Sequence, residues 1–135
     1  MFLVDTNVWL ERLLDQAQSA DVKGFLDATP ADELRVTDFS FHSIGVILAR
    51  LGRGELLSQF VRDVFIDSGV VLVALEPTDM DRLIELMVAF RLDFDDAYQC
   101  AAAEKFDLQI VSFDHDFDQT PRKRVSPGAA SSRTV

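Results

Sequence analysis

Three aspartates that border apolar segments are the residues best suited to chemistry in this sequence. Asp5 ends the apolar run 2–4, Asp96 begins a segment rich in alanine, and Asp114 comes soon after the apolar run 108–111. Carboxylates brought together repel one another, and each raises the pKa of its neighbours unless a cation offsets the repulsion. Oxygen ligands favour hard cations such as Mg²⁺ or Mn²⁺, which lower the pKa of bound water and orient phosphodiesters. If the three acids converge, they form a metal site suited to phosphodiester hydrolysis.

The order of the apolar segments predicts how these acids are positioned. Short apolar runs alternate with segments of helical periodicity. Strands are expected at residues 2–4, 34–37, 70–75 and 108–111, and helices at 7–14, 21–28, 41–51, 55–67, from 78 onward, and from 95 or 96 to about 106. Such alternation predicts an α/β fold, a three-layer α/β/α sandwich with a mostly parallel central sheet. Ligands of parallel sheets bind beyond the carboxyl ends of the strands, where Asp5, Asp96 and Asp114 would meet.

Two local expectations follow from the same patterns. The unbroken apolar run 70–75 predicts a strand buried on both faces. Thr78 is expected to cap the next helix, with Asp81 three residues later in the manner of a capping box.

The length of 135 residues fits one domain, which we place at residues 1–119. Residues 120–135 turn to proline, serine, glycine, alanine and basic side chains and predict a disordered tail. The basic run Arg122-Lys123-Arg124 either keeps the chain in solution or contacts phosphate. Cys100 is the only cysteine and no apolar run is long enough to span a bilayer, so we expect a cytoplasmic protein with no membrane partner.

The formal net charge of −10 argues against a nucleic-acid partner, because phosphate binding normally rests on a basic surface. The objection weakens if several carboxylates hold divalent ions, since the ions then invert the local field.

Three acidic segments together resemble one protein family. Residues 2–10 (FLVDTNVWL) are similar to the opening of PIN domains, where an apolar strand ends in Asp followed by Thr or Ser and Asn. Residues 96–103 (DAYQCAAA) resemble the second acidic segment, and residues 110–117 (IVSFDHDF) the third. Their order and spacing are closest to the short bacterial members, many of which are VapC-type toxins of toxin–antitoxin pairs.

The resemblance implies a PIN fold, Mg²⁺- or Mn²⁺-dependent cleavage of RNA, a homodimer and an antitoxin partner. It makes Asp5, Asp96 and Asp114 catalytic metal ligands and Asp116 an auxiliary ligand. Supporting roles fall to residues beside them, with Thr6 and Asn7 next to Asp5 and with the hydroxyl of Ser112 orienting Asp114.

One departure from the family concerns a Glu expected in the helix after the second strand. By spacing from Thr37, Ser43 occupies that position, so the site lacks one charge unless Asp38, His42 or Asp116 compensates. The alternative to a ribonuclease is therefore a catalytically impaired PIN-like domain that binds RNA or a protein. An aspartyl phosphatase is a third, weaker interpretation, because Asn7 stands where that class needs a second Asp.

Several candidate residues also have purely structural interpretations. Asp5 could serve only as a helix cap, and Asp93, Asp95 and Asp96 could be a solvated loop with favourable charge at the amino end of a helix. His42 is more often a packed or surface residue than a ligand, and His115 has no expected role. Aromatic residues at helical spacing suit a core or a dimer surface, namely Trp9, Phe41, Phe60 and Phe65.

Overall fold

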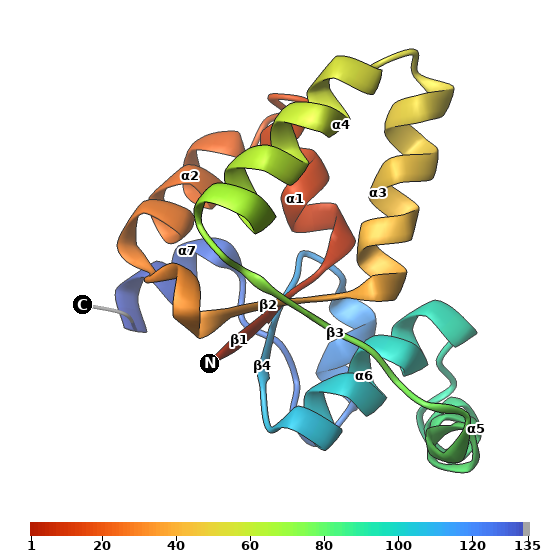
Figure 1. Cartoon of the computed structure of the whole chain (residues 1–135). Helices are drawn as coiled ribbons and strands as arrows, with labels where there is room; N and C mark the ends of the chain where they lie inside the picture. Colours follow the sequence, from red (N-terminus) through yellow and green to blue (C-terminus); the bar gives the residue numbers. More distant parts are fainter. Residues whose placement is uncertain (134–135) are drawn as a thin grey trace.

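A four-stranded parallel sheet in the order β3-β2-β1-β4 forms the centre of the computed structural model, which describes residues 1–133 (Figure 1). The strands are β1 (Phe2–Val4), β2 (Leu34–Thr37), β3 (Val71–Val73) and β4 (Gln109–Val111). The helices are α1 (Thr6–Leu13), α2 (Ser19–Ala28), α3 (Asp38–Arg50), α4 (Gly54–Phe60), α5 (Met80–Phe90), α6 (Phe94–Phe106) and α7 (Pro127–Arg133). Short 3₁₀ turns are η1 (Ala31–Glu33), η3 (Pro77–Asp79) and η4 (His115–Gln119), and η2 (Val61–Asp67) is a π-helix. The predicted α/β fold with a parallel sheet is confirmed.

Two apolar cores lie on the two faces of this sheet, because successive side chains of a strand point to opposite faces. Leu3 and Ile110 join the core that α5 and α6 cover. Val4 and Val111 join the core under α1, α2, α3, α4 and α7. The three layers expected from the sequence are therefore present. No helix in the described part of the chain is both long and apolar enough to cross a membrane.

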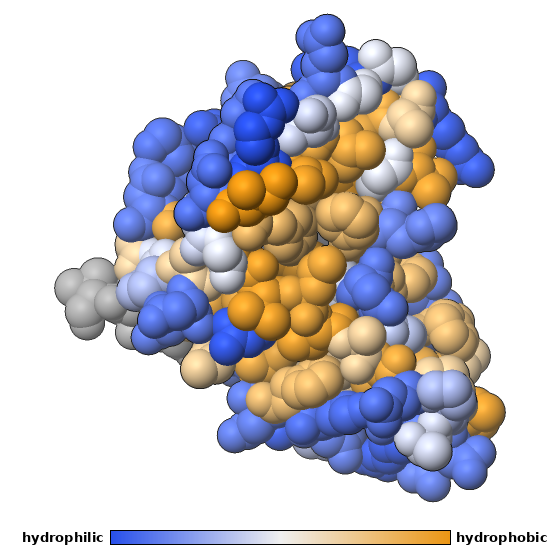
Figure 2. Space-filling model, in the orientation of Figure 1, coloured by the Kyte–Doolittle hydropathy of each residue, from blue (hydrophilic) through white to orange (hydrophobic). Residues whose placement is uncertain are grey.

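β3 differs from the prediction, because it is an edge strand and is not buried on both faces. Val73 is buried, whereas Val71 is 47% and Leu72 is 44% exposed. The apolar run 70–75 therefore belongs to a strand at the open edge of the sheet. Ile66, which precedes this strand, is also exposed, at 69%. Apolar side chains gather in the middle of the face that β3 crosses (Figures 1 and 2). The exposed side chains of Ile66, Val71 and Leu72 along this sheet edge, with Val71 and Leu72 on opposite faces of the sheet, are together called the β3 apolar surface below.

The predicted Thr78 cap is also wrong. Glu76 and Asp79 form the capping box instead, and the backbone N–H of Glu76 donates to Oδ2 of Asp79 at 2.7 Å. Pro77 is pre-organised for a first helical position, so the helical segment begins before Thr78, which lies inside η3.

Residues 120–133 are not the disordered tail that their composition predicts. Val125 forms an isolated parallel bridge with Val111 and is buried. α7 then packs against α2 with Ala130 fully buried. The edge of β4 offers backbone partners to this segment: the N–H of Val125 donates to the carbonyl of Ile110 at 2.9 Å, and the N–H of Ser112 donates to the carbonyl of Val125 at 3.1 Å. The domain boundary at residue 119 is thus too early, and residues 134–135 of the predicted tail lie outside the described residues.

Candidate metal centre

The three predicted acids lie around one cleft at the carboxyl ends of β1 and β4. These strands are paired in parallel with Val4 opposite Val111, so the chain beyond each strand emerges at the same edge. Asp96 reaches that edge from the first turn of α6. The cleft has a volume of about 280 Å³ and is lined by Asp5, Thr6, Asn7, Leu10, Phe39, Ser43, Ile47, Asp95, Asp96, Gln99 and Asp114. The predicted convergence of Asp5, Asp96 and Asp114 on one cleft is therefore observed.

The carboxylates of Asp96, Asp114 and Asp116 form the tightest acidic group. One oxygen of each lies within 4.8 Å of the others. Two helix caps place them: Asp93 accepts from the backbone N–H of Asp96 at 2.9 Å, and Asp114 accepts from that of Asp116 at 2.9 Å. Asp93 thus has the capping role that its position suggests. We call Asp96, Asp114 and Asp116 the outer carboxylates.

Asp5 lies in the same cleft but is held differently. Its side chain is buried, with Oδ1 accepting from the backbone N–H of Thr6 at 2.8 Å and from Nε2 of Gln99 at 2.9 Å. Oδ2 accepts from the hydroxyl of Ser112 at 2.7 Å. Asp5 is therefore a helix cap and a buried site residue at the same time, so the two interpretations of this residue do not compete.

Ser112 connects Asp5 to Asp114. Besides donating to Asp5, its hydroxyl oxygen accepts from the backbone N–H of Asp114 at 2.9 Å and from Nδ2 of Asn7 at 3.3 Å. Asn7 in turn accepts from the backbone N–H of Phe113 at 3.3 Å. Ser112 thus contacts the main chain of Asp114 rather than its carboxylate, and the predicted support takes this form.

The electrostatics of the cleft suit a cation. Burial raises the pKa of Asp5 above its usual value, an effect that hydrogen bonds from Ser112, Gln99 and Thr6 oppose and the charge of Asp114 reinforces. Burial, followed by the charges of Asp114, Asp93, Asp5 and Asp116, raises the pKa of Asp96 to about 7. A divalent ion would relieve this repulsion, and the donor set is made only of oxygen, which matches Mg²⁺ or Mn²⁺.

The position of the expected Glu is occupied by a side chain of the cleft. Ser43 lines the cleft, as its spacing predicts. His42 is exposed and lies outside the cleft lining, while Asp38 accepts from the phenol of Tyr98 at 2.7 Å. Of the three residues considered as compensation, only Asp116 belongs to the tight acidic group.

A buried polar cluster beside Asp5 was not predicted as part of the site. Gln99 is 2% exposed, and its Nε2 donates to the hydroxyl oxygen of Ser40 at 2.8 Å as well as to Asp5. Its Oε1 accepts from the hydroxyl of Thr37 at 2.8 Å, and Thr6 donates to Ser40 at 2.9 Å. The spacing of Gln99 from Asp96, three residues on one helix, is the signal that could have identified it.

The other aromatic and basic candidates have structural roles. Trp9 and Phe60 are each 3% exposed and pack edge to face at 5.4 Å, so they belong to the core and give no reason for a dimer. Arg122 pairs with Asp107 at 3.1 Å and Arg124 with Asp118 at 3.3 Å. These two guanidinium groups therefore already have carboxylate partners within the chain.

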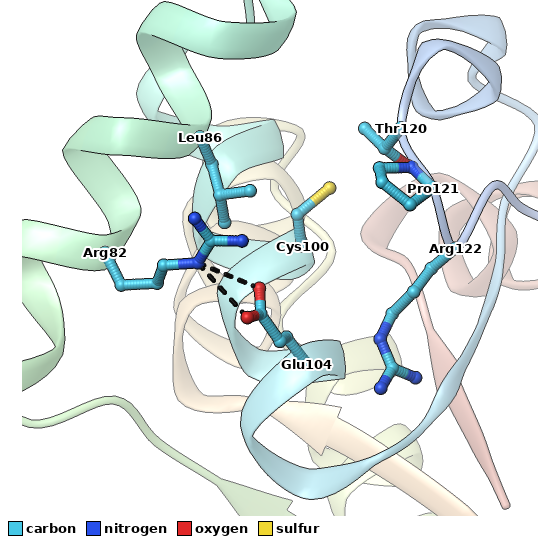
Figure 3. Close-up of a pocket in the computed structure, with 7 residues that line it drawn as sticks. All are labelled: Arg82, Leu86, Cys100, Glu104, Thr120, Pro121 and Arg122. Atoms are coloured by element: carbon cyan, nitrogen blue, oxygen red, sulfur yellow. Dashed lines mark hydrogen bonds and ion pairs between the residues drawn. The ribbon is translucent and has the colours of Figure 1, made fainter.

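A second cavity, of about 190 Å³, lies farther along α6 beside α5 and residues 120–122 (Figure 3). Nε of Arg82 donates to both oxygens of Glu104, at 3.1 and 3.2 Å. Burial raises the pKa of the Cys100 thiol to about 12, so it stays protonated at neutral pH. This cavity lacks a carboxylate group comparable to the outer carboxylates.

Comparison with known proteins assigns the class. The family model of the PIN domain matches residues 2–123, and the chain belongs to that family. No curated protein sequence matches the chain significantly.

Several solved structures share this fold, among them one described as a toxin–antitoxin complex and one described as a toxin. A toxin–antitoxin complex from Klebsiella pneumoniae is 19% identical, with a TM-score of 0.76 over 94% of this chain and 98% of that one. VapC20 of Mycobacterium tuberculosis, described as a toxin that cleaves the sarcin–ricin loop, is 19% identical, with a TM-score of 0.74 over 87% and 93%. FitAcB from Neisseria gonorrhoeae is 19% identical, with a TM-score of 0.74 over 94% and 98%. At this identity the likeness establishes the fold.

Proposed function

We propose that this PIN domain is a metal-dependent endoribonuclease and the toxin of a type II toxin–antitoxin pair. The observation that carries the proposal is the meeting of Asp96, Asp114 and Asp116 within 4.8 Å, beside buried Asp5, at the carboxyl edge of a parallel sheet. The cleft lining contains the carboxylates of Asp5, Asp95, Asp96 and Asp114 and no basic side chain, an arrangement that is costly unless the site serves a cation.

Mg²⁺ or Mn²⁺ would be held by the outer carboxylates together with Asp5. A carboxylate oxygen has two lone pairs, so Oδ1 of Asp5 is filled by its two donors, while Oδ2, with one donor, keeps capacity for a ligand. When bound, such an ion supplies an activated water and stabilises the charge that develops on the phosphate oxygens.

The residues of the chain itself bind and orient. Asn7 and Ser112 fix the loop that carries Asp114, so the acidic group is preformed on rigid elements. Leu10, Phe39 and Ile47 give the cleft an apolar wall, which suits contact with the sugar and base of a nucleotide. The cleft lining holds no Cys, Lys or His nucleophile, and direct attack by water on the phosphodiester is the reaction that a metal-binding acidic lining suits best.

The alternative function is an impaired PIN-like domain that binds RNA or a protein without cleavage. Ser43 is the observation that favours it, because a neutral hydroxyl stands in the cleft where the family has a carboxylate. Asp116 supplies a fourth acid beside Asp96 and Asp114. We therefore favour a ribonuclease of low activity that prefers Mn²⁺, whose coordination is less demanding than that of Mg²⁺.

An antitoxin and a second copy of the chain are the proposed partners. Two of the structural relatives are described as a toxin–antitoxin complex and as FitAB bound to a DNA fragment. The β3 apolar surface, together with Ile84 and Val88 on α5 at 54% and 76% exposed, offers apolar area that a partner could cover. With a net charge of −10, a basic antitoxin segment is the electrostatically favoured partner.

The test is cleavage of a panel of fluorescent RNAs by the purified protein with Mn²⁺, with Mg²⁺ and with EDTA. The proposal expects cleavage with Mn²⁺, less with Mg²⁺ and none with EDTA. RNA binding without cleavage under all three conditions would favour the impaired domain, and neither binding nor cleavage would contradict both functions.

A further inference from the structure

Gln99 is the most completely hydrogen-bonded side chain near the site, and its burial suggests that it acts through Asp5. Its amide is 2% exposed and is surrounded by partners from three elements: Asp5 after β1, Thr37 at the end of β2 and Ser40 on α3. A buried amide contributes stability only when its donors and acceptor are all paired, and here both N–H groups and the carbonyl have partners.

The orientation of this amide follows from the chemistry of its partners. Reversing it would place Oε1 against the carboxylate of Asp5, and two acceptors would then face each other. Thr37 donates to Oε1 while its own oxygen accepts from the backbone N–H of Ser40 at 3.0 Å, so Thr37 fixes the carbonyl end. The Nε2 end is therefore held toward Asp5.

We propose that Gln99 is a positioning residue of the metal centre: its amide saturates Oδ1 of Asp5 and leaves Oδ2 as the oxygen available to a cation. The proposal rests on the proposed metal-dependent function and adds that Asp5 binds through one oxygen. The donor from Gln99 is neutral, so it holds the carboxylate in place without cancelling the charge that a metal needs. Mutation of a residue that hydrogen-bonds to a metal ligand typically lowers metal affinity by about 10- to 100-fold.

The same amide ties together the elements that carry the rest of the cleft. α6 carries Asp96 and Gln99, and α3 carries Ser40 and Ser43. Through Gln99, the position of Asp5 is coupled to both helices. A change at Gln99 should therefore alter the geometry of the cleft without changing any of its carboxylates.

The experiment compares Gln99→Met with a matched variant on the same helix, Cys100→Ala. Met keeps the length of the side chain and removes the amide, whereas Cys100 lines the second cavity (Figure 3) and is not among the three hydrogen-bond donors to Asp5, which are Thr6, Gln99 and Ser112. Two properties are measured in each: the side-chain rotamer of Asp5 from three-bond NMR couplings without metal, and the affinity for Mn²⁺ by calorimetry.

The wild type and Cys100→Ala should show one Asp5 rotamer and equal Mn²⁺ affinity. Gln99→Met should show averaged rotamers and an affinity lower by about tenfold. A folded Gln99→Met protein with the wild-type rotamer and affinity would overturn the proposal. If Gln99→Met does not fold, Thr37→Val replaces it, because that isosteric change frees the carbonyl end of the amide and should shift both readouts in the same direction.

The two measurements separate this proposal from the proposed function. If wild type binds Mn²⁺ and Asp96→Asn does not, the metal centre stands, and Gln99→Met decides the positioning role. If wild type binds no Mn²⁺, the metal-dependent function fails, and an Asp5 rotamer unaffected by Gln99→Met would then reject the positioning role as well.

Discussion

The two halves of the acidic cleft are built in different ways. Asp5 is buried and receives three hydrogen bonds from Thr6, Gln99 and Ser112. The outer carboxylates are more exposed and lie close to one another, and their helix caps satisfy backbone groups rather than neutralise charge. The inner half is thus pre-organised by neutral donors, whereas the outer half carries repulsion that a cation would relieve. The inner half, at Asp5, therefore contributes to the stability of the fold as well as to the proposed metal site.

The largest expected effect is on activity, at the outer half. Asp114→Asn should lower RNA cleavage with Mn²⁺ by more than about 100-fold, because it removes a proposed metal ligand. Loss of a residue that only hydrogen-bonds to a ligand already costs about 10- to 100-fold. Cleavage rates on a fluorescent RNA measure the effect. Asp27→Asn, at an exposed acid outside the cleft, is the control and should retain full activity. Equal losses in both variants would show that net charge, and not the cleft, controls the rate.

Substitutions in the two halves of the cleft should change the stability of the metal-free protein in opposite directions. Asp5→Asn should destabilise the protein by about 1–3 kcal/mol, since its amide would meet buried donors that need an acceptor. Asp96→Asn should instead raise the melting temperature in EDTA by relieving the repulsion around it. Thermal unfolding at pH 8 gives both values. Destabilisation of similar size in both variants would erase the proposed distinction.

The pH dependence of stability should sharpen the same contrast. The pKa of Asp96 rises from 3.8 to about 7 in the folded chain, so the native state holds a proton that the unfolded state releases between these values. The contribution of Asp96 to the stability of the metal-free protein is therefore greatest at low pH, and it declines as pH rises from about 4 to about 7. The difference in melting temperature between wild type and Asp96→Asn should follow that decline. A difference that is constant across this range would contradict the raised pKa.

A smaller gain is expected from restoring the missing carboxylate. Ser43→Glu should tighten Mn²⁺ binding and increase RNA cleavage, because Ser43 lines the cleft and the added charge completes the outer half. Calorimetry and the RNA panel measure the two effects. A folded variant with no gain in either would mean that Asp116 already fills this role, and Asp116→Asn should then abolish activity.

The smallest effect on chemistry is expected outside the cleft. Leu72→Lys places a charge on the β3 apolar surface and should weaken homodimer or antitoxin association, as measured by light scattering, while leaving Mn²⁺ affinity unchanged. A species of 15.1 kDa at all micromolar concentrations in both wild type and variant would contradict the homodimer.

The features of this fold that depend on local patterns of residues could be predicted from the amino-acid sequence. Short apolar runs predicted the strands and runs of period 3.6 predicted the helices, and the carboxyl ends of parallel strands placed Asp5 and Asp114 at one edge. The resemblance to the family, with the spacing from Thr37, also predicted that Ser43 takes the place of the usual Glu, and Ser43 lines the cleft.

Other features depend on residues that are distant in the sequence and come together only when the chain folds. A run of apolar residues does not distinguish a central strand from an edge strand. The exposure of β3 follows from its position at the edge of the sheet. Val125 and α7 are ordered because Val125 pairs with β4 and α7 packs against α2. The composition of residues 120–133 does not reveal these contacts. The role of Gln99 required Thr37, Ser40 and Asp5 to arrive from three elements, because a buried amide acquires its function from the groups that satisfy it.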